Sequence, residues 1–175
     1  MNAWESLMIS SLLPPMAVAA LFLGTILTGS AHADEFKLTG AWTLQSMIFV
    51  DAETGKMTND FGERPNGYML YTPNGYMTSL ITAEGRQPVP ATSDHAADLR
   101  SQLLTSMNAL AGPYSLSDGK LVIHVEVAHD PRLVGTDTIR FLKVTDKDHV
   151  ESTTPVTINA AGKKVKVVLT WQRIT

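Results

Sequence analysis

Two segments of alternating apolar and polar residues are the strongest constraint on how this chain can fold. They span 121–128 and 136–144, and the seven residues between them include Pro131 and Gly135. An alternation with a period of two places successive side chains on opposite faces of a β-strand. The pattern therefore predicts a long antiparallel hairpin with a turn region at 129–135.

The register of this hairpin follows if the apolar residues of both strands share one face. Val125 then lies opposite Ile139, and the apolar face holds Ile123, Val125, Val127, Ile139 and Phe141. On the opposite face His124 lies opposite Arg140, and Glu126 lies opposite Thr138. This pairing predicts a patch in which an imidazole, a carboxylate and a guanidinium lie together.

Six further stretches have strand character. They are residues 43–50, 68–72, 76–82, 114–116, 149–154 and 163–173. Proline followed by Asn74-Gly75 joins two of these stretches and is typical of a tight hairpin turn. About eight strands in hairpin order favour an all-β fold, an up-and-down antiparallel β-barrel, because closing the sheet removes its unpaired edges.

One α-helix is predicted near residues 94–111, inserted between strands. Apolar residues recur there at helical spacing, and Gly112-Pro113 follows as a stop signal. An apolar stripe on such a helix is typical of packing, so we expect the helix to lie against the barrel.

Residues 1–33 have the features of a secretory signal peptide. The stretch 12–27 is apolar, and Ala31-His-Ala33 matches a cleavage site, which predicts cutting after Ala33 and a periplasmic or secreted protein. Glu5 is the only charged residue of this segment, whereas signal peptides begin with positive charge. An uncleaved membrane anchor therefore stays open as an alternative. After cleavage, residues 34–175 form one domain with no further membrane span.

Composition excludes several classes of function. The chain has no cysteine, which rules out disulfides, thiolate catalysis and cysteine metal ligands. Its formal net charge is −3, and this mildly acidic balance argues against nucleic acid as a partner. His124, His129 and Asp130 are close in sequence, but their spacing does not favour a metal site, so we expect no metal.

Several short motifs together resemble the bacterial lipocalin-like domain family over residues 36–174. They include Gly40-Ala-Trp42, the stretch 67–77, His124-Val-Glu126 and the stretch 169–173. The resemblance implies a closed barrel whose interior can take a small ligand, without a known substrate or a cofactor. It also implies a structural closure in which a cation, Arg173 or Arg140, packs across Trp42.

The candidate site residues fall into two groups. His124 and Glu126 are candidate catalytic residues, because histidine exchanges protons near neutral pH and a carboxylate can orient it. The candidate ligand-binding residues are Arg140, Thr138, Tyr68, Tyr71, Tyr76 and Met77. Arg140 could hold an anion, while the tyrosines and methionines could form a pocket wall. Each group also has a purely structural interpretation: the polar patch could face water, and the aromatic residues could be core.

Three functional hypotheses follow. The first is an exported lipocalin-like protein that binds a small, partly apolar ligand, hydrophobic or amphiphilic and able to carry negative charge, in the barrel. The alternative is a cofactor-free isomerase or cyclase in which His124 and Glu126 move a proton and Arg140 anchors an anion. The third is an envelope protein that acts through its surface. The sequence leaves the oligomeric state open.

Overall fold

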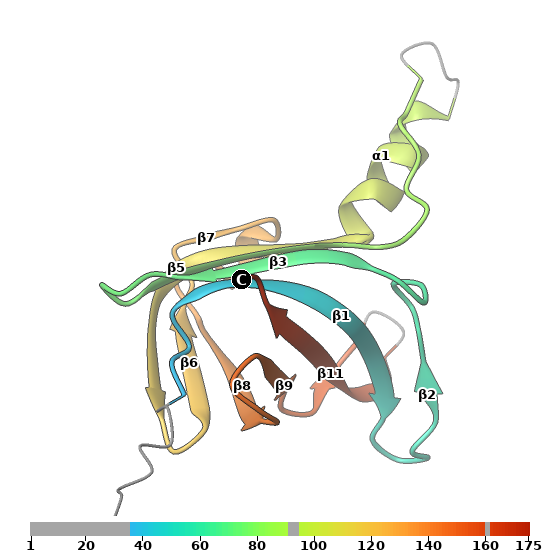
Figure 1. Cartoon of the computed structure of the whole chain (residues 1–175). Coiled ribbons are helices and arrows are strands. Elements are labelled where there is room, and N and C mark those ends of the chain that lie inside the picture. Colours follow the sequence, from blue (N-terminus) through green and yellow to red (C-terminus); the bar gives the residue numbers. More distant parts are fainter. Residues whose placement is uncertain (1–35, 91–94, 160–161) are drawn as a thin grey trace, which may run out of the picture. The chain divides into compact units, whose positions relative to one another are not determined.

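The strands of the computed structural model form one antiparallel sheet that closes into a barrel (Figure 1). The structure describes residues 36–90, 95–159 and 162–175. The eight barrel strands are β1 (Gly40–Asp51), β3 (Asn66–Tyr71), β4 (Tyr76–Thr82), β5 (Met107–Ser117), β6 (Lys120–His124), β8 (Asp137–Val144), β9 (His149–Thr153) and β11 (Lys164–Arg173). Pairing of β1 with β11 closes the barrel. The all-β barrel expected from the sequence is confirmed.

Three short strands and a 3₁₀ helix complete the described sheet and its connections. They are β2 (Met57–Thr58), β7 (Val127–Ala128), β10 (Thr157–Ile158) and η1 (Pro131–Leu133). The turn between β3 and β4 follows the sequence prediction, since Gly75 has a φ of 84°, a conformation that glycine adopts without strain. The signal peptide predicted at 1–33 lies outside the described residues.

Alternation along β3 and β4 decides which side chains enter the barrel. In both strands buried and exposed residues alternate, so Tyr71 and Met77 point inward while their sequence neighbours point out. Trp42, Trp171, Leu121, Val125 and Val150 are the largest fully buried side chains of the described core. Burial of such apolar side chains stabilises the fold by about 1.5–3 kcal/mol each.

Trp42 and Arg173 pack together where the first and last strands of the barrel pair. The Arg173 guanidinium lies 4.2 Å from the centroid of the Trp42 ring and donates hydrogen bonds to the carbonyl oxygens of Lys37 and Thr39. The Trp42 indole N–H donates to the Leu38 carbonyl at 2.8 Å. The cation over Trp42 is therefore Arg173, which leaves Arg140 to another role.

The helix is shorter than the sequence suggests. α1 spans Ala96–Thr105, and residues 107–111, predicted as helix, belong to β5 instead. β5 pairs with β4 from Thr82↔Met107 to Tyr76↔Pro113. A barrel without this strand would leave the edge of β4 unpaired, so sheet closure overrides the helical spacing.

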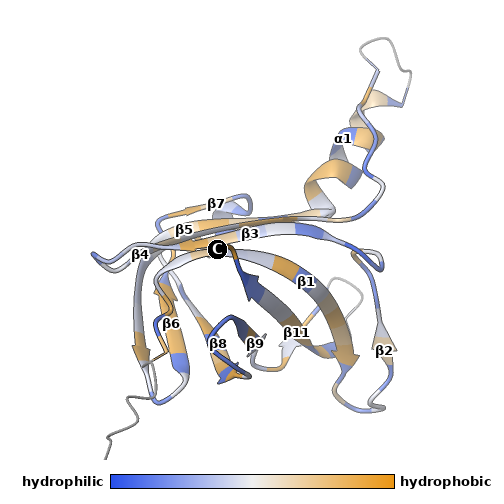
Figure 2. Ribbon diagram, in the orientation of Figure 1, coloured by the Kyte–Doolittle hydropathy of each residue, from blue (hydrophilic) through white to orange (hydrophobic). Residues whose placement is uncertain are grey.

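The expected packing of the helix against the barrel is also wrong. None of the ten described residues of α1 is buried, although the helix carries both apolar and polar residues (Figure 2). Within the described residues, no helix has the length and apolar character needed to cross a membrane.

The central hairpin forms, but in a different register. Ile123 pairs with Thr138 rather than with Phe141, a difference of three residues, and His124 pairs with Asp137. An odd shift turns the side chains of one strand to the opposite face. The cause is that residues 126–128 leave the hairpin: Val125, rather than Ala128, hydrogen-bonds with Thr136, and Val127–Ala128 pair with β5 as β7.

Candidate functional site

Two adjoining cavities occupy the barrel interior. The mouth cavity has a volume of about 280 Å³ and is lined by Met47, Phe49, Phe61, Ile81, Thr105, Met107, Asn108, Arg140, Thr154, Val167 and Leu169. The floor cavity has about 30 Å³, room for one or two waters, and is lined by Met69, Tyr71, Met77, Ser79, Ile81, Asn108, Leu110, Leu121, Ile123, Arg140, Ser152, Leu169 and Trp171. Four residues line both cavities: Ile81, Asn108, Arg140 and Leu169.

Arg140 is the only ionised side chain among the described residues that line these cavities. β8 turns it inward because Arg140 pairs with Leu121, a buried residue of β6. Its Nη1 donates a hydrogen bond of 2.8 Å to the carbonyl oxygen of Ile139. None of the ion pairs found within the described residues involves Arg140.

Electrostatics around Arg140 favour an incoming anion. Burial lowers the pKa of Arg140, and the nearby Tyr71 phenol partly opposes this shift. A guanidinium nevertheless stays protonated at neutral pH. Arg140 is half-buried, so its guanidinium has lost part of its hydration without gaining an opposite charge within the described residues, which is unfavourable. A carboxylate entering the mouth cavity would supply that charge and accept two parallel hydrogen bonds.

Tyr71 keeps its phenolic proton beside Arg140. Burial raises the pKa of Tyr71 above its ordinary value, and the positive charge of Arg140 opposes this effect only in part. The hydroxyl lies 3.1 Å from the Met69 sulfur, and the ring packs edge-on against Tyr114 with centroids 4.9 Å apart. Tyr71 therefore contributes a neutral phenol to the floor cavity, with its proton donated to the Met69 sulfur.

Polar residues missed by the sequence analysis also line the interior. Ser79 and Ser152 are buried, and the Ser152 hydroxyl accepts a hydrogen bond of 3.3 Å from the Trp171 indole. Asn108 lines both cavities from β5. Asn108 was hidden because it lies in the segment predicted as helix. In a strand, Asn108 and Leu110 are two residues apart and therefore face the same side. Since Leu110 is buried, a strand assignment would have predicted that Asn108 faces the interior.

His124 and Glu126 lie outside the barrel, away from Arg140. His124 Nδ1 is 2.9 Å from an oxygen of Asp137, and its side chain is 55% exposed. Glu126 is exposed as well. The predicted patch of His124, Glu126 and Arg140 is therefore wrong. The three-residue shift in register separates Arg140 from the other two residues. A proton transfer inside the barrel by His124 and Glu126, with Arg140 as anchor, has no geometric basis.

The remaining predicted residues divide between the two faces of the sheet. Tyr71 and Met77 line the floor cavity. Tyr68 and Tyr76 are exposed, so the structure does not place them in an interior pocket wall. Thr138 is half-buried opposite Ile123 but is not among the cavity-lining residues.

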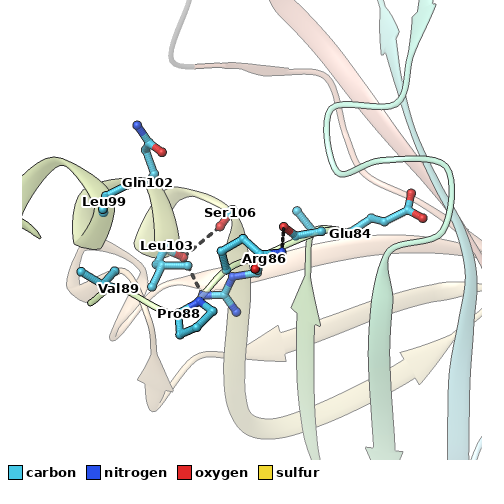
Figure 3. A pocket seen from close by; sticks show the side chains of 11 residues that line it. Glu84, Arg86, Pro88, Val89, Leu99, Gln102, Leu103 and Ser106 are labelled. Carbon is cyan, nitrogen blue, oxygen red and sulfur yellow. Dashed lines mark hydrogen bonds between the residues drawn. The ribbon is translucent and has the colours of Figure 1, made fainter. Parts of the chain in front are cut away.

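A further cavity of about 420 Å³ lies between α1 and residues 83–89 (Figure 3). Pro88, Val89 and Leu103 form apolar parts of its wall. Arg86 donates a hydrogen bond of 2.9 Å to the Leu103 carbonyl, while its Nε is buried without a partner in the described residues. Leu103 lies in the last turn of α1, where the helix dipole is negative, so this end repels an anion.

No group of three or more acidic, histidine or cysteine side chains suited to a metal ion occurs in the part of the chain that the structure describes.

Comparisons with known proteins support this description of the fold. A family profile described as a lipocalin-like domain matches residues 39–174. The chain belongs to the lipocalin-like domain family. Its barrel architecture is one that generally binds small molecules.

No curated protein matches this lipocalin-like chain. Among solved structures, it is similar to a redesigned β-barrel, with 13% identity and a TM-score of 0.36. That similarity covers 79% of this chain and 92% of the other, and at such a TM-score it adds nothing to the family assignment.

Proposed function

We propose that this lipocalin-like protein binds a small, partly apolar carboxylate in the barrel interior. The observation that carries the proposal is Arg140, an inward-facing guanidinium at the junction of two cavities with no ion-pair partner in the described chain. A carboxylate there would restore the charge balance that burial of Arg140 removes.

The walls of the mouth cavity define the rest of the ligand. Phe49 and Phe61 stack with ring centroids 5.9 Å apart, and Met47 and Val167 add further apolar surface. The volume of about 280 Å³ lies just below the range of typical ligand pockets, roughly 300–1,000 Å³. These features favour a compact molecule with one acidic group and an apolar body over a long-chain lipid.

We place this function outside the cytoplasm as part of the same proposal. The support is the sequence pattern of residues 1–33, with its apolar stretch and Ala31-His-Ala33.

The binding test compares acids with neutral analogues of the same shape. Octanoate and phenylacetate, with 1-octanol and phenylacetamide as neutral partners, would be titrated into the protein by isothermal calorimetry. We expect at least one acid to bind about 10- to 100-fold more tightly than its neutral partner, the range that one charge-assisted hydrogen bond provides.

Arg140→Gln tests the residue itself and should remove this preference for the acid. Arg132→Gln is the matched control, because Arg132 is an exposed arginine on η1 that pairs with Asp130. Equal affinity for acid and neutral analogue, or an unchanged preference in Arg140→Gln, would contradict the proposal.

A further inference from the structure

We infer that two copies of this chain associate face to face through the outer surface of β3, β4 and β5. This uncharged face is separate from the barrel interior, so the inference does not depend on the ligand.

The three strands lack charged residues altogether. β3, β4 and β5 contain no Asp, Glu, Lys or Arg, whereas every other strand of five or more residues in the described chain has at least one. β6 has Lys120, β9 has Glu151 and β11 has Lys164 and Lys166. Charged residues on the outer faces of strands keep a barrel soluble and disfavour association with other molecules. Three adjacent strands without charge therefore distinguish one side of the molecule as a candidate contact surface.

Outward-facing residues form two continuous rows across this face. In the first row Tyr68 pairs with Leu80, and Leu80 pairs with Ala109. The second row consists of Leu70, Thr78, Ala111 and Val127, each paired with the next. The large side chains of both rows are exposed, including Tyr68 at 57% and Leu80 at 49%. Tyrosine and aliphatic residues arranged in this way resemble the core of a protein interface.

Charged residues of both signs border the uncharged face beyond β5, including the ion pair of Arg132 with Asp130 on the segment after β7. Glu126 and Asp137 are exposed there, and the whole chain has a net charge of −3. Docking on a lipid surface usually relies on basic residues around the apolar contact. The described border residues are thus mixed in charge rather than mainly basic, which argues against an anionic membrane as the partner.

A second copy fits the uncharged face better. In a twofold dimer, residues near the axis meet their own counterparts, so like charges there would repel, and this face has none. Strand spacing gives its size: a seven-residue strand is about 24 Å long, and β3, β4, β5 and the adjoining β7, each about 4.8 Å wide, span about 19 Å. Each copy would thus contribute roughly 500 Å², and the pair would bury about 1,000 Å², the lower limit for a specific interface. We therefore expect a weak, reversible dimer.

The test is sedimentation velocity over micromolar to submillimolar concentrations, on protein purified after expression of the full-length sequence. The wild type should shift from monomer to dimer with concentration. The double variant Tyr68→Lys/Leu80→Lys should raise the dimer dissociation constant at least about 30-fold, because it places like charges in the centre of the interface.

Phe141→Lys/Val144→Lys is the matched control. These two β8 residues are exposed to a similar extent, 50% and 45%, but lie away from the uncharged face. The control should dimerise like the wild type. A wild type that stays monomeric throughout, or a dimer that the Tyr68/Leu80 variant does not weaken, would overturn the inference. Monomers that co-sediment with vesicles of phosphatidylcholine and phosphatidylglycerol through Tyr68 and Leu80 would overturn it in favour of a membrane.

Discussion

At the scale of single residues, the described interior of this barrel combines apolar side chains, a few neutral polar ones and one cation that forms no ion pair with the described residues. Arg140 is held by the carbonyl of its own neighbour, Ile139, and faces the Tyr71 phenol across the floor cavity. Replacing a buried charge with an apolar residue is often neutral or stabilising, so such a residue is poor evidence of a contribution to stability. Its position is better explained by a ligand than by folding.

Tyr71 offers a prediction on pH that does not depend on a ligand. Its folded pKa is raised by burial, so the folded protein keeps the phenolic proton where the unfolded chain releases it, above about pH 10. The contribution of Tyr71 to stability is complete below pH 10 and declines as the pH rises further. The slope is at most about 1.4 kcal/mol per pH unit.

Urea unfolding between pH 9 and 11.5 would measure this slope. Tyr71→Phe should lose less stability per pH unit than the wild type over that range. It should keep part of the decline, because burial also raises the pKa of Tyr114. Tyr68→Phe removes an exposed phenol and should behave like the wild type. Identical slopes for Tyr71→Phe and the wild type would contradict the prediction.

At the scale of elements, β5 controls the geometry of the barrel wall. It pairs with β4 along seven residues and with both β6 and β7 on its other edge. The bulge between β6 and β7 brings the His124 carbonyl oxygen to 1.9 Å from the position that a Cβ on Gly112 would occupy. Gly112 is thus required by a close approach of two backbones, and its φ is not in the left-handed region.

Gly112→Ala is therefore expected to destabilise the protein by about 3 kcal/mol or more, since backbone atoms cannot move aside as a side chain can. Gly67→Ala is the comparison, because its Cβ would meet the Leu44 and Ile81 side chains at 3.0–3.1 Å. We expect the Gly67 change to cost about 1–2 kcal/mol. Urea unfolding would rank the two, and the reverse order would show that the bulge can relax.

At the scale of the whole molecule, the proposed ligand site lies in the barrel interior and the proposed contact between copies lies on its outer surface. Arg173 packs over Trp42, and the stacked rings of Phe49 and Phe61 line the mouth cavity. The uncharged face of β3, β4 and β5 lies on the outer surface, so association of two copies there would leave the interior accessible.

Export is the prediction that belongs to this scale. If Ala31-His-Ala33 is a cleavage site, the protein secreted from full-length expression should begin at Asp34. Intact mass measurement and N-terminal sequencing of the periplasmic and medium fractions would show this. Ala33→Leu should block cleavage and retain the precursor, whereas Ser30→Ala leaves the motif intact. Full-length protein found mainly in the membrane fraction would favour the uncleaved anchor.

The amino-acid sequence by itself determined the fold class and the faces of several strands. Period-two alternation and the Pro73-Asn-Gly75 turn are local properties, and they predict a barrel and the hairpin of β3 and β4. The same alternation separates Tyr68 from Tyr71, since residues three apart on a strand face opposite ways. Strand alternation alone therefore excludes that Tyr68 and Tyr71 both line the interior.

Only the tertiary structure decided the candidate site. Residues 126–128 leave the hairpin to pair with β5, so β6 and β8 pair three residues away from the predicted register and Arg140 turns inward opposite Leu121, whereas His124 faces outward in alternation with the buried Ile123. Residues 107–111 became a strand because the edge of β4 needs a partner, and this placed Asn108 in the cavity wall. Register and closure depend on hydrogen bonds between distant segments. Local periodicity cannot specify them, because an odd shift exchanges the two faces of a strand without changing its pattern.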